Sequence, residues 1–154
     1  MRDLARTMAS TKITAHQEMF NPEVHPFGEI TILAVDSMTT RRAIWDNLKA
    51  DAAVRLMVEA RMGVSEIRVM CMCPADPAKR YEATLYTAEE SVAGACQTQT
   101  TVVATACATA SFIVWSVIEF LGGNPPVNEM ILALAGRRPM ITTSFRPEPA
   151  GETL

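Results

Sequence analysis

The stretch that decides the fold runs from Ile30 to Trp45 and reads ITILAVDSMTTRRAIW. Residues 30–35 form a mostly apolar run rich in β-branched side chains, which is typical of a buried strand. Asp36 follows the run directly, and residues 39–50 carry apolar side chains at helical spacing. The sequence therefore predicts a buried, parallel strand that ends at Asp36 and leads into a helix.

The position of Asp36 suggests a ligand site. In open α/β sheets, nucleotides and their metal ions bind beyond the carboxyl ends of the strands. Arg41, in the following helix, could reach a phosphate or the Asp36 carboxylate. The alternatives are that Asp36 caps the helix and that Arg41 lies on a solvated helix face. No Gly-x-Gly-x-x-Gly or Gly-x-x-x-x-Gly-Lys-Ser/Thr sequence precedes this segment, so the usual phosphate-binding loop is missing from it.

The rest of the chain predicts one mixed α/β domain over residues 1–146 and a flexible tail over residues 147–154. We expect a partly parallel sheet that is extended by antiparallel strands. The further strands are predicted at residues 12–15, 54–59, 66–73, 81–86, 128–135 and 139–145, and the further helices at residues 2–9 and 96–121.

The bulk properties exclude several classes of function. The formal net charge is −3 with no block of like charge, which argues against nucleic acid as a partner. The four cysteines do not form the paired sets of a zinc site, so we expect no metal centre of that kind and reduced thiols in a cytoplasmic protein.

Residues 101–121 are nearly uncharged and almost long enough to span a membrane. Five Thr and Ser side chains interrupt them, which disfavours insertion into lipid, and we expect no membrane span. Because the segment is apolar nearly all round, we predict a long helix buried inside the domain or in a dimer, with Cys107 as a packing residue.

Four motifs occur in a familiar order. Asp36-Ser37 is followed by Arg41, then come VEARMG at residues 58–63, YEATL at residues 81–85, and Cys96 at the start of a helix rich in Thr and Ala. In this order and spacing the chain resembles the later part of the ThiF/HesA/MoeB adenylyltransferases, which are relatives of the ubiquitin-activating enzymes.

The resemblance implies a partial Rossmann-like sheet and an ATP-dependent activity. In that family the residue matching Asp36 helps to position ATP and magnesium while the carboxyl terminus of a ubiquitin-like or sulfur-carrier protein is adenylated. It also implies that Arg41 lies near the nucleotide. The family's Gly-rich turn lies upstream of the region that this chain resembles, so we expect the chain alone to be incomplete for catalysis. The alternative is a non-catalytic module that keeps the fold for dimerisation or for docking a ubiquitin-like partner.

Two further expectations concern reactivity and assembly. Cys96 stands at a helix start, where the helix dipole can lower a thiol pKa and produce a nucleophile. Most free cysteines are small buried residues, and we expect Cys96 to be one of them. A strand at residues 12–15 or its neighbour would leave one sheet edge unpaired, which predicts a homodimer or a complementary chain.

Overall fold

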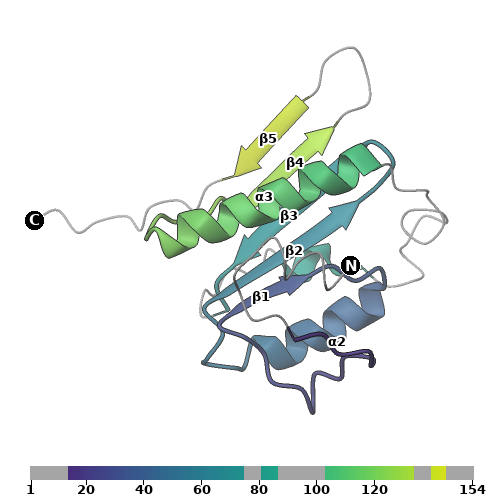
Figure 1. The fold of residues 1–154 in the computed structure, drawn as a ribbon, viewed down its shortest axis with the longest axis vertical. Helices are drawn as coiled ribbons and strands as arrows, with labels where there is room; N and C mark the ends of the chain where they lie inside the picture. The colour runs from purple at the N-terminus through teal and green to yellow at the C-terminus, as the bar shows by residue number, and fades with distance from the viewer. Residues whose placement is uncertain (1–13, 75–80, 87–102, 134–139, 145–154) are drawn as a thin grey trace, which may run out of the picture.

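The computed structural model describes residues 14–74, 81–86, 103–133 and 140–144. They form a five-stranded sheet whose strands lie in chain order, with helices on both faces (Figure 1). The elements are β1 (Ile30–Leu33), α2 (Met38–Leu48), β2 (Leu56–Met62), β3 (Glu66–Met72), η1 (Glu82–Thr84), α3 (Val103–Leu121), β4 (Glu129–Ala133) and β5 (Met140–Ser144).

The sheet is mixed, as the sequence predicted. β1 and β2 are parallel and are joined through α2, because a parallel pair needs a long crossover connection. β2, β3, β4 and β5 then pair in antiparallel fashion. The α/β class and the extension of a parallel pair by antiparallel strands are confirmed.

The alternation of side chains along β2 divides the core into two parts. Met57 points to the face covered by α2 and η1, where it packs with Trp45, Leu48 and Tyr81. Leu56 and Val58 point to the opposite face, which α3 covers over β2 and β3. The sheet is therefore buried on both sides in its centre, between a layer of α2 with η1 and a layer of α3.

Several predicted boundaries move. The first strand ends at Leu33 rather than residue 35, and β2 continues to Met62, so the turn into β3 begins at Gly63, whose N–H donates to Glu66 O at 2.8 Å. Thr14 and Ala15 are not part of a strand. The remainder of the predicted strand at residues 12–15, the helix at residues 2–9 and the tail at residues 147–154 lie outside the described residues.

The strand predicted at residues 81–86 is wrong. These residues form a 3₁₀ turn, η1, which begins after Tyr81. The Tyr81 and Leu85 side chains are both buried, and they lie four residues apart, which suits a helical turn that places them on one side. The alternating pattern of the sequence was misread because the segment packs its apolar side chains on the α2 face of the sheet instead of joining an edge.

Of the two alternatives predicted for the long helix, burial inside the domain is wrong, and burial in a dimer stays a prediction. The described part of the helix, α3, buries Thr105, Thr109 and Ser116 against the sheet. Its other side is open, and Cys107, expected to be a packing residue, is exposed there. By length and composition α3 could cross a membrane, with a mean hydropathy of 1.6, and 17% of its most apolar window is buried in the structure.

Candidate functional site

Asp36 lies on the exposed loop between β1 and α2, beyond the carboxyl end of a parallel strand. It does not cap the helix: Ser37 is the N-cap, and its hydroxyl accepts a hydrogen bond from Thr40 N at 3.3 Å. α2 has no acidic residue in its first turn. The Asp36 carboxylate therefore stands next to a helix N-terminus, where backbone N–H groups and the helix dipole favour anions.

Arg41 lies in the interior of the protein. Its side chain is buried, and its Nε lies 2.7 Å from Glu59 Oε1. Its Nη2 donates to the backbone carbonyl of Val35, the residue before Asp36. Arg41 thus connects α2, β2 and the loop that carries Asp36, and its guanidinium faces the protein interior rather than the solvent.

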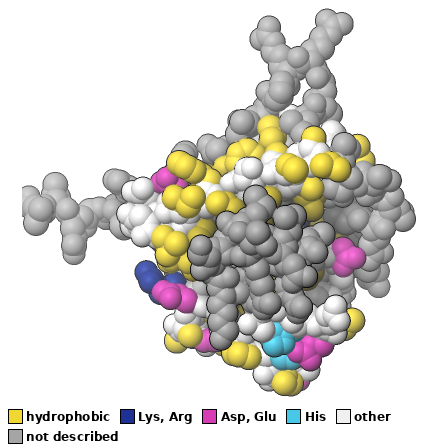
Figure 2. Space-filling model, viewed as in Figure 1, with side chains coloured by type: hydrophobic (Ala, Val, Ile, Leu, Met, Phe, Trp, Pro, Cys, Tyr) yellow, Lys and Arg dark blue, Asp and Glu magenta, His cyan; other side chains and the backbone are white. Residues whose placement is uncertain are grey.

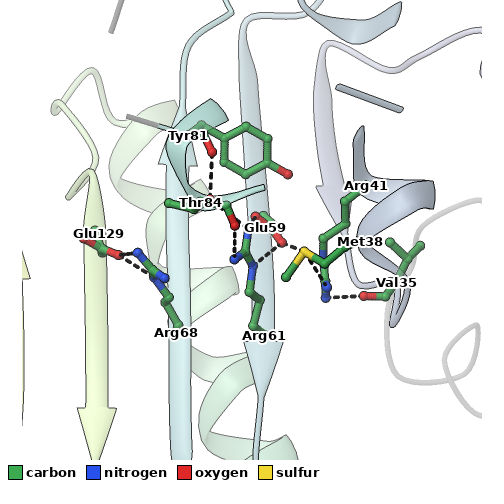
Figure 3. A network of polar contacts seen from close by, with 9 residues as sticks. All are labelled: Val35, Met38, Arg41, Glu59, Arg61, Arg68, Tyr81, Thr84 and Glu129. Carbon is green, nitrogen blue, oxygen red and sulfur yellow. Dashed lines mark hydrogen bonds and ion pairs between the residues drawn. The ribbon is translucent and has the colours of Figure 1, made fainter. Parts of the chain in front are cut away.

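A buried ionic cluster follows from this placement. Glu59 is fully buried in the middle of β2, and Arg61, two residues further along the same strand face, binds it through two hydrogen bonds of 2.7 and 3.0 Å. Figure 3 shows Arg41 from α2 and Arg61 from β2 meeting at this one carboxylate. Two cations around one anion leave the cluster with a net positive charge, which is stable in a buried position only while the carboxylate is present.

The 3₁₀ turn closes the cluster on one side. Arg61 also donates to Thr84, to the backbone oxygen at 3.0 Å and to the hydroxyl oxygen at 2.9 Å, and the Thr84 hydroxyl donates to Tyr81 O at 2.7 Å (Figure 3). The Tyr81 ring packs edge-on against Trp45 with centroids 4.7 Å apart. The position of η1 is thus fixed by polar contacts to β2 and by an aromatic contact to α2.

The Tyr81 hydroxyl is the unusual group of this region. It is buried, and among the described residues it has no hydrogen-bond partner. Burial raises the pKa of Tyr81 well above its usual value, and the negative charge of Glu59 raises this pKa further. The phenol therefore stays neutral at physiological pH.

Part of this cluster could have been predicted from the alternation of residues along β2. Glu59 and Arg61 alternate with Val58 and Ala60, so both charges fall on one face of a strand whose other face is apolar. Two opposite charges on one face of a central strand indicate a buried ion pair. The third member, Arg41, could not be found in this way because it comes from another element.

The cysteines take no part in this site. Cys96 lies outside the described residues. Cys71 and Cys73 line a separate cavity of about 300 Å³ between β3 and the segment after α3, and burial raises the pKa of the Cys71 thiol. Within the described ranges, no three His, Cys, Asp or Glu residues lie close enough to hold a metal ion.

Comparison with known proteins gives a likeness of structure. No protein-family model matches the chain, and no curated protein matches it. Among solved structures, the crystal structure of selenomethionine-labelled PaaA superposes with a TM-score of 0.49 at 19% sequence identity, over 76% of this chain and 42% of that one. The chain thus spans about two fifths of the length of PaaA.

Proposed function

We propose that this chain is a module of the ThiF adenylyltransferase type, with a nucleotide and magnesium site at the carboxyl end of β1. The observation that carries the proposal is the placement of Asp36: exposed, unpaired within the described part of the chain, and adjacent to the N-terminus of α2. Magnesium in nucleotide sites takes one or two carboxylates and completes its shell with phosphate oxygens and water. One well-placed carboxylate beside a helix N-terminus suits that role.

Arg41 holds the loop that carries Asp36 from the interior of the protein. Its hydrogen bond to Val35 O holds the backbone immediately before Asp36, and its ion pair with Glu59 anchors that bond to the central strand. We assign it a positioning role, since its guanidinium is turned away from the surface on which a phosphate would lie. This role differs from the direct contact to a phosphate that the sequence allowed for Arg41.

The open side of β1 is consistent with a Rossmann-like arrangement. β1 is the outermost strand of the described sheet. A cavity of about 350 Å³ runs along this strand and is lined by apolar side chains that include Phe27, Ile30 and Ile32. A further parallel strand could pair with this edge and bring a phosphate-binding turn next to Asp36. The site in our proposal is therefore shared between Asp36 and residues beyond those described.

The reaction of this family type joins a carboxylate oxygen of a carrier protein to the α-phosphorus of ATP and releases pyrophosphate. The carrier would be a ubiquitin-like or sulfur-carrier protein. In that reaction Asp36 would hold the metal ion that neutralises the phosphates, while Arg41 and Glu59 keep the loop rigid. Cys96 is not needed for this step, and we assign it no catalytic role.

Titration with Mg-ATP, followed by amide chemical shifts, tests the proposal. We expect shifts concentrated in residues 34–38, and weaker binding for Asp36→Asn than for the wild type. Asp46→Asn is the matched control, because Asp46 is an exposed carboxylate of α2 that pairs with Lys49 and lies outside the loop. Shifts that spare residues 34–38, or equal affinities for the Asp36→Asn and Asp46→Asn proteins, would show that the site is not there.

A second function, as an interaction module without catalysis, is favoured by a different observation. α3 exposes large apolar side chains along one side, and this face has no use in nucleotide binding at the opposite layer of the sheet.

A further inference from the structure

The outer side of α3 carries half of the exposed large hydrophobic side chains among the described residues. Figure 2 shows hydrophobic side chains gathered along this helix. The most exposed are Val103 (77%), Val114 (57%), Trp115 (58%), Ile118 (50%) and Leu121 (69%). Monomeric proteins rarely leave so many neighbouring large apolar side chains in water, so this side of the helix calls for a partner.

The spacing of the exposed positions identifies the kind of surface. Exposed residues recur along α3 at intervals of three, four, three, four and three residues, and they are Ala104, Cys107, Ser111, Val114, Ile118 and Leu121. This is the heptad spacing of a helix that packs along its whole length against another helix. Thr109 and Ser116, on the opposite side of α3, are buried on the sheet, so the heptad stripe points away from the domain.

Side-chain size along the stripe is graded in one direction. The three positions nearest the start of α3 are small (Ala104, Cys107, Ser111), and the three nearest its end are large. If a second copy of α3 lay antiparallel to the first, every large residue would meet a small one. The pairs are Leu121 with Ala104, Ile118 with Cys107, and Val114 with Ser111. In a parallel arrangement small would meet small and large would meet large, with voids at one end and crowding at the other.

We propose that α3 is a homodimerisation helix, which pairs in antiparallel fashion with α3 of a second copy of this chain about a two-fold axis near residues 111–114. Such a contact is self-complementary, as a two-fold interface must be. Trp115 lies beside the stripe and would extend the contact on one flank. The proposal does not depend on nucleotide binding.

The polar groups of the stripe are compatible with burial. The Ser111 hydroxyl donates to Cys107 O at 2.9 Å within the helix, so it needs no partner from water. Glu119, the one charged residue of α3, is half-buried beside the stripe and accepts a hydrogen bond from Asn124 at 2.9 Å. Pairing two helices here therefore leaves no unpaired charge inside the interface.

The area is sufficient for a specific dimer. With roughly 100–250 Å² for each fully exposed aliphatic or aromatic side chain, the five large side chains expose on the order of 500 Å² per copy. Two copies would bury on the order of 1,000 Å², which is the lower bound of a specific interface. A lipid surface would also accept apolar side chains, but it would give no reason for the size gradient along the stripe.

Sedimentation at micromolar concentration, with a charge placed in the stripe, gives the first test. We expect the wild type to be dimeric and Ile118→Glu to weaken the dimer on the order of 100-fold or more, because each copy would bury an uncompensated carboxylate. Val24→Glu introduces the same charge at another exposed apolar position, 72% exposed in the loop before β1, and we expect it to leave the dimer intact. A monomeric wild type, or equal effects of the two substitutions, would overturn the proposal.

A size exchange tests the antiparallel order. Ala104→Leu alone should crowd the contact with Leu121, and Leu121→Ala alone should leave a void, so each should weaken the dimer. The double variant recreates a large residue opposite a small one at both ends, and we expect it to recover most of the affinity. Both positions are exposed in the monomer, so the fold should survive, which circular dichroism and the unfolding temperature would verify. Additive losses in the double variant would contradict the antiparallel pairing.

Oxidative cross-linking separates the remaining possibilities. Ile118→Cys places a thiol opposite Cys107 of the second copy, so we expect a disulfide-linked dimer that disappears when Cys107→Ser is added. Linkage through Cys107 alone in the wild type would indicate parallel pairing and overturn the proposal. The last test is sedimentation with vesicles of phosphatidylcholine and phosphatidylglycerol. If the fraction of wild-type protein bound to the vesicles did not change with protein concentration, and Ile118→Glu abolished the binding, the face would be assigned to lipid instead.

Discussion

At the scale of single residues, Glu59 has the most consequence for stability, because its one buried carboxylate is the counter-charge of two guanidinium groups. We expect Glu59→Gln to lower the free energy of unfolding by about 3–5 kcal/mol, since it leaves Arg41 and Arg61 as buried cations without a counter-charge. Urea unfolding would measure this. Glu29→Gln is the control, because Glu29 forms an exposed pair with Arg55, and its loss should cost less than about 1 kcal/mol. Equal losses for the two variants would show that the buried cluster is dispensable.

Tyr81 allows a prediction that depends on pH. Its folded pKa lies above the ordinary value of 10.0, so the unfolded chain loses the phenolic proton first as pH rises. The native state is therefore fully stable with respect to this group below pH 10, and stability falls as the pH rises above it. Tyr81→Phe should change stability by less than about 1 kcal/mol at neutral pH, because the hydroxyl has no hydrogen bond to lose within the described part of the chain.

Above pH 10 the Phe variant should become more stable than the wild type, by a margin that grows with pH. Thermal unfolding over pH 7 to 11 would show the two curves separating only in the alkaline range. A constant difference between the proteins across that range would mean that Tyr81 does not titrate as its surroundings indicate.

At the scale of elements, α2 starts where it does because of Ser37 rather than Asp36. Ser37→Ala removes the side-chain acceptor of the Thr40 N–H, and we expect a loss of about 1 kcal/mol. Thr39→Ala changes an exposed residue two positions later, in the first turn of α2, and should be neutral or slightly stabilising, since alanine has the highest helix propensity. If Thr39→Ala cost as much as Ser37→Ala, the cap assignment would be incorrect.

The elements that the sequence predicted well are those whose signal is local. The run before Asp36 and the helical spacing after it locate β1 and α2 to within a few residues, because the periods of an apolar strand and of an amphipathic helix are visible in the sequence. The prediction that this strand is buried is wrong, because β1 is the outermost strand of the described sheet and Ile32 is 53% exposed. Segment 81–86 was misread because its geometry is set from outside, by hydrogen bonds from Arg61 to Thr84 and by the Trp45 ring. The ionic cluster could not be predicted for the same reason, since no spacing in the sequence indicates that Arg41 contacts Glu59.

For α3 the sequence predicted the apolar character and the end at Leu121, but not the exposure. A helix that is apolar on all sides is normally buried, and the prediction of a helix buried inside the domain or in a dimer followed from that rule. The described sheet covers only the side with Thr105, Thr109 and Ser116, and the heptad stripe remains open. Under our proposal, the apolar character on all sides of α3 reflects two different contacts, one to the sheet and one to a second copy.

At the scale of the whole molecule, the proposed nucleotide site and the proposed dimerisation helix lie on opposite faces of the sheet. α2 and the Asp36 loop belong to one layer, and α3 belongs to the other. Two copies joined through α3 would therefore leave both Asp36 loops open to ligand. Nucleotide binding and dimerisation should accordingly be independent, so that Ile118→Glu leaves the response of residues 34–38 to Mg-ATP unchanged.

The final prediction concerns catalysis by these 154 residues. Exchange of pyrophosphate into ATP needs the phosphates to be held through the transfer, and the Gly-rich turns that usually provide the backbone N–H groups are missing before β1. A single carboxylate can hold a metal ion but cannot by itself stabilise the charge that develops on the phosphates. We therefore expect purified chain to show no ATP–pyrophosphate exchange above that of Asp36→Asn, even where Mg-ATP shifts the amides of the loop. Exchange that is abolished by Asp36→Asn and retained by Asp46→Asn would show instead that the chain completes its own phosphate site.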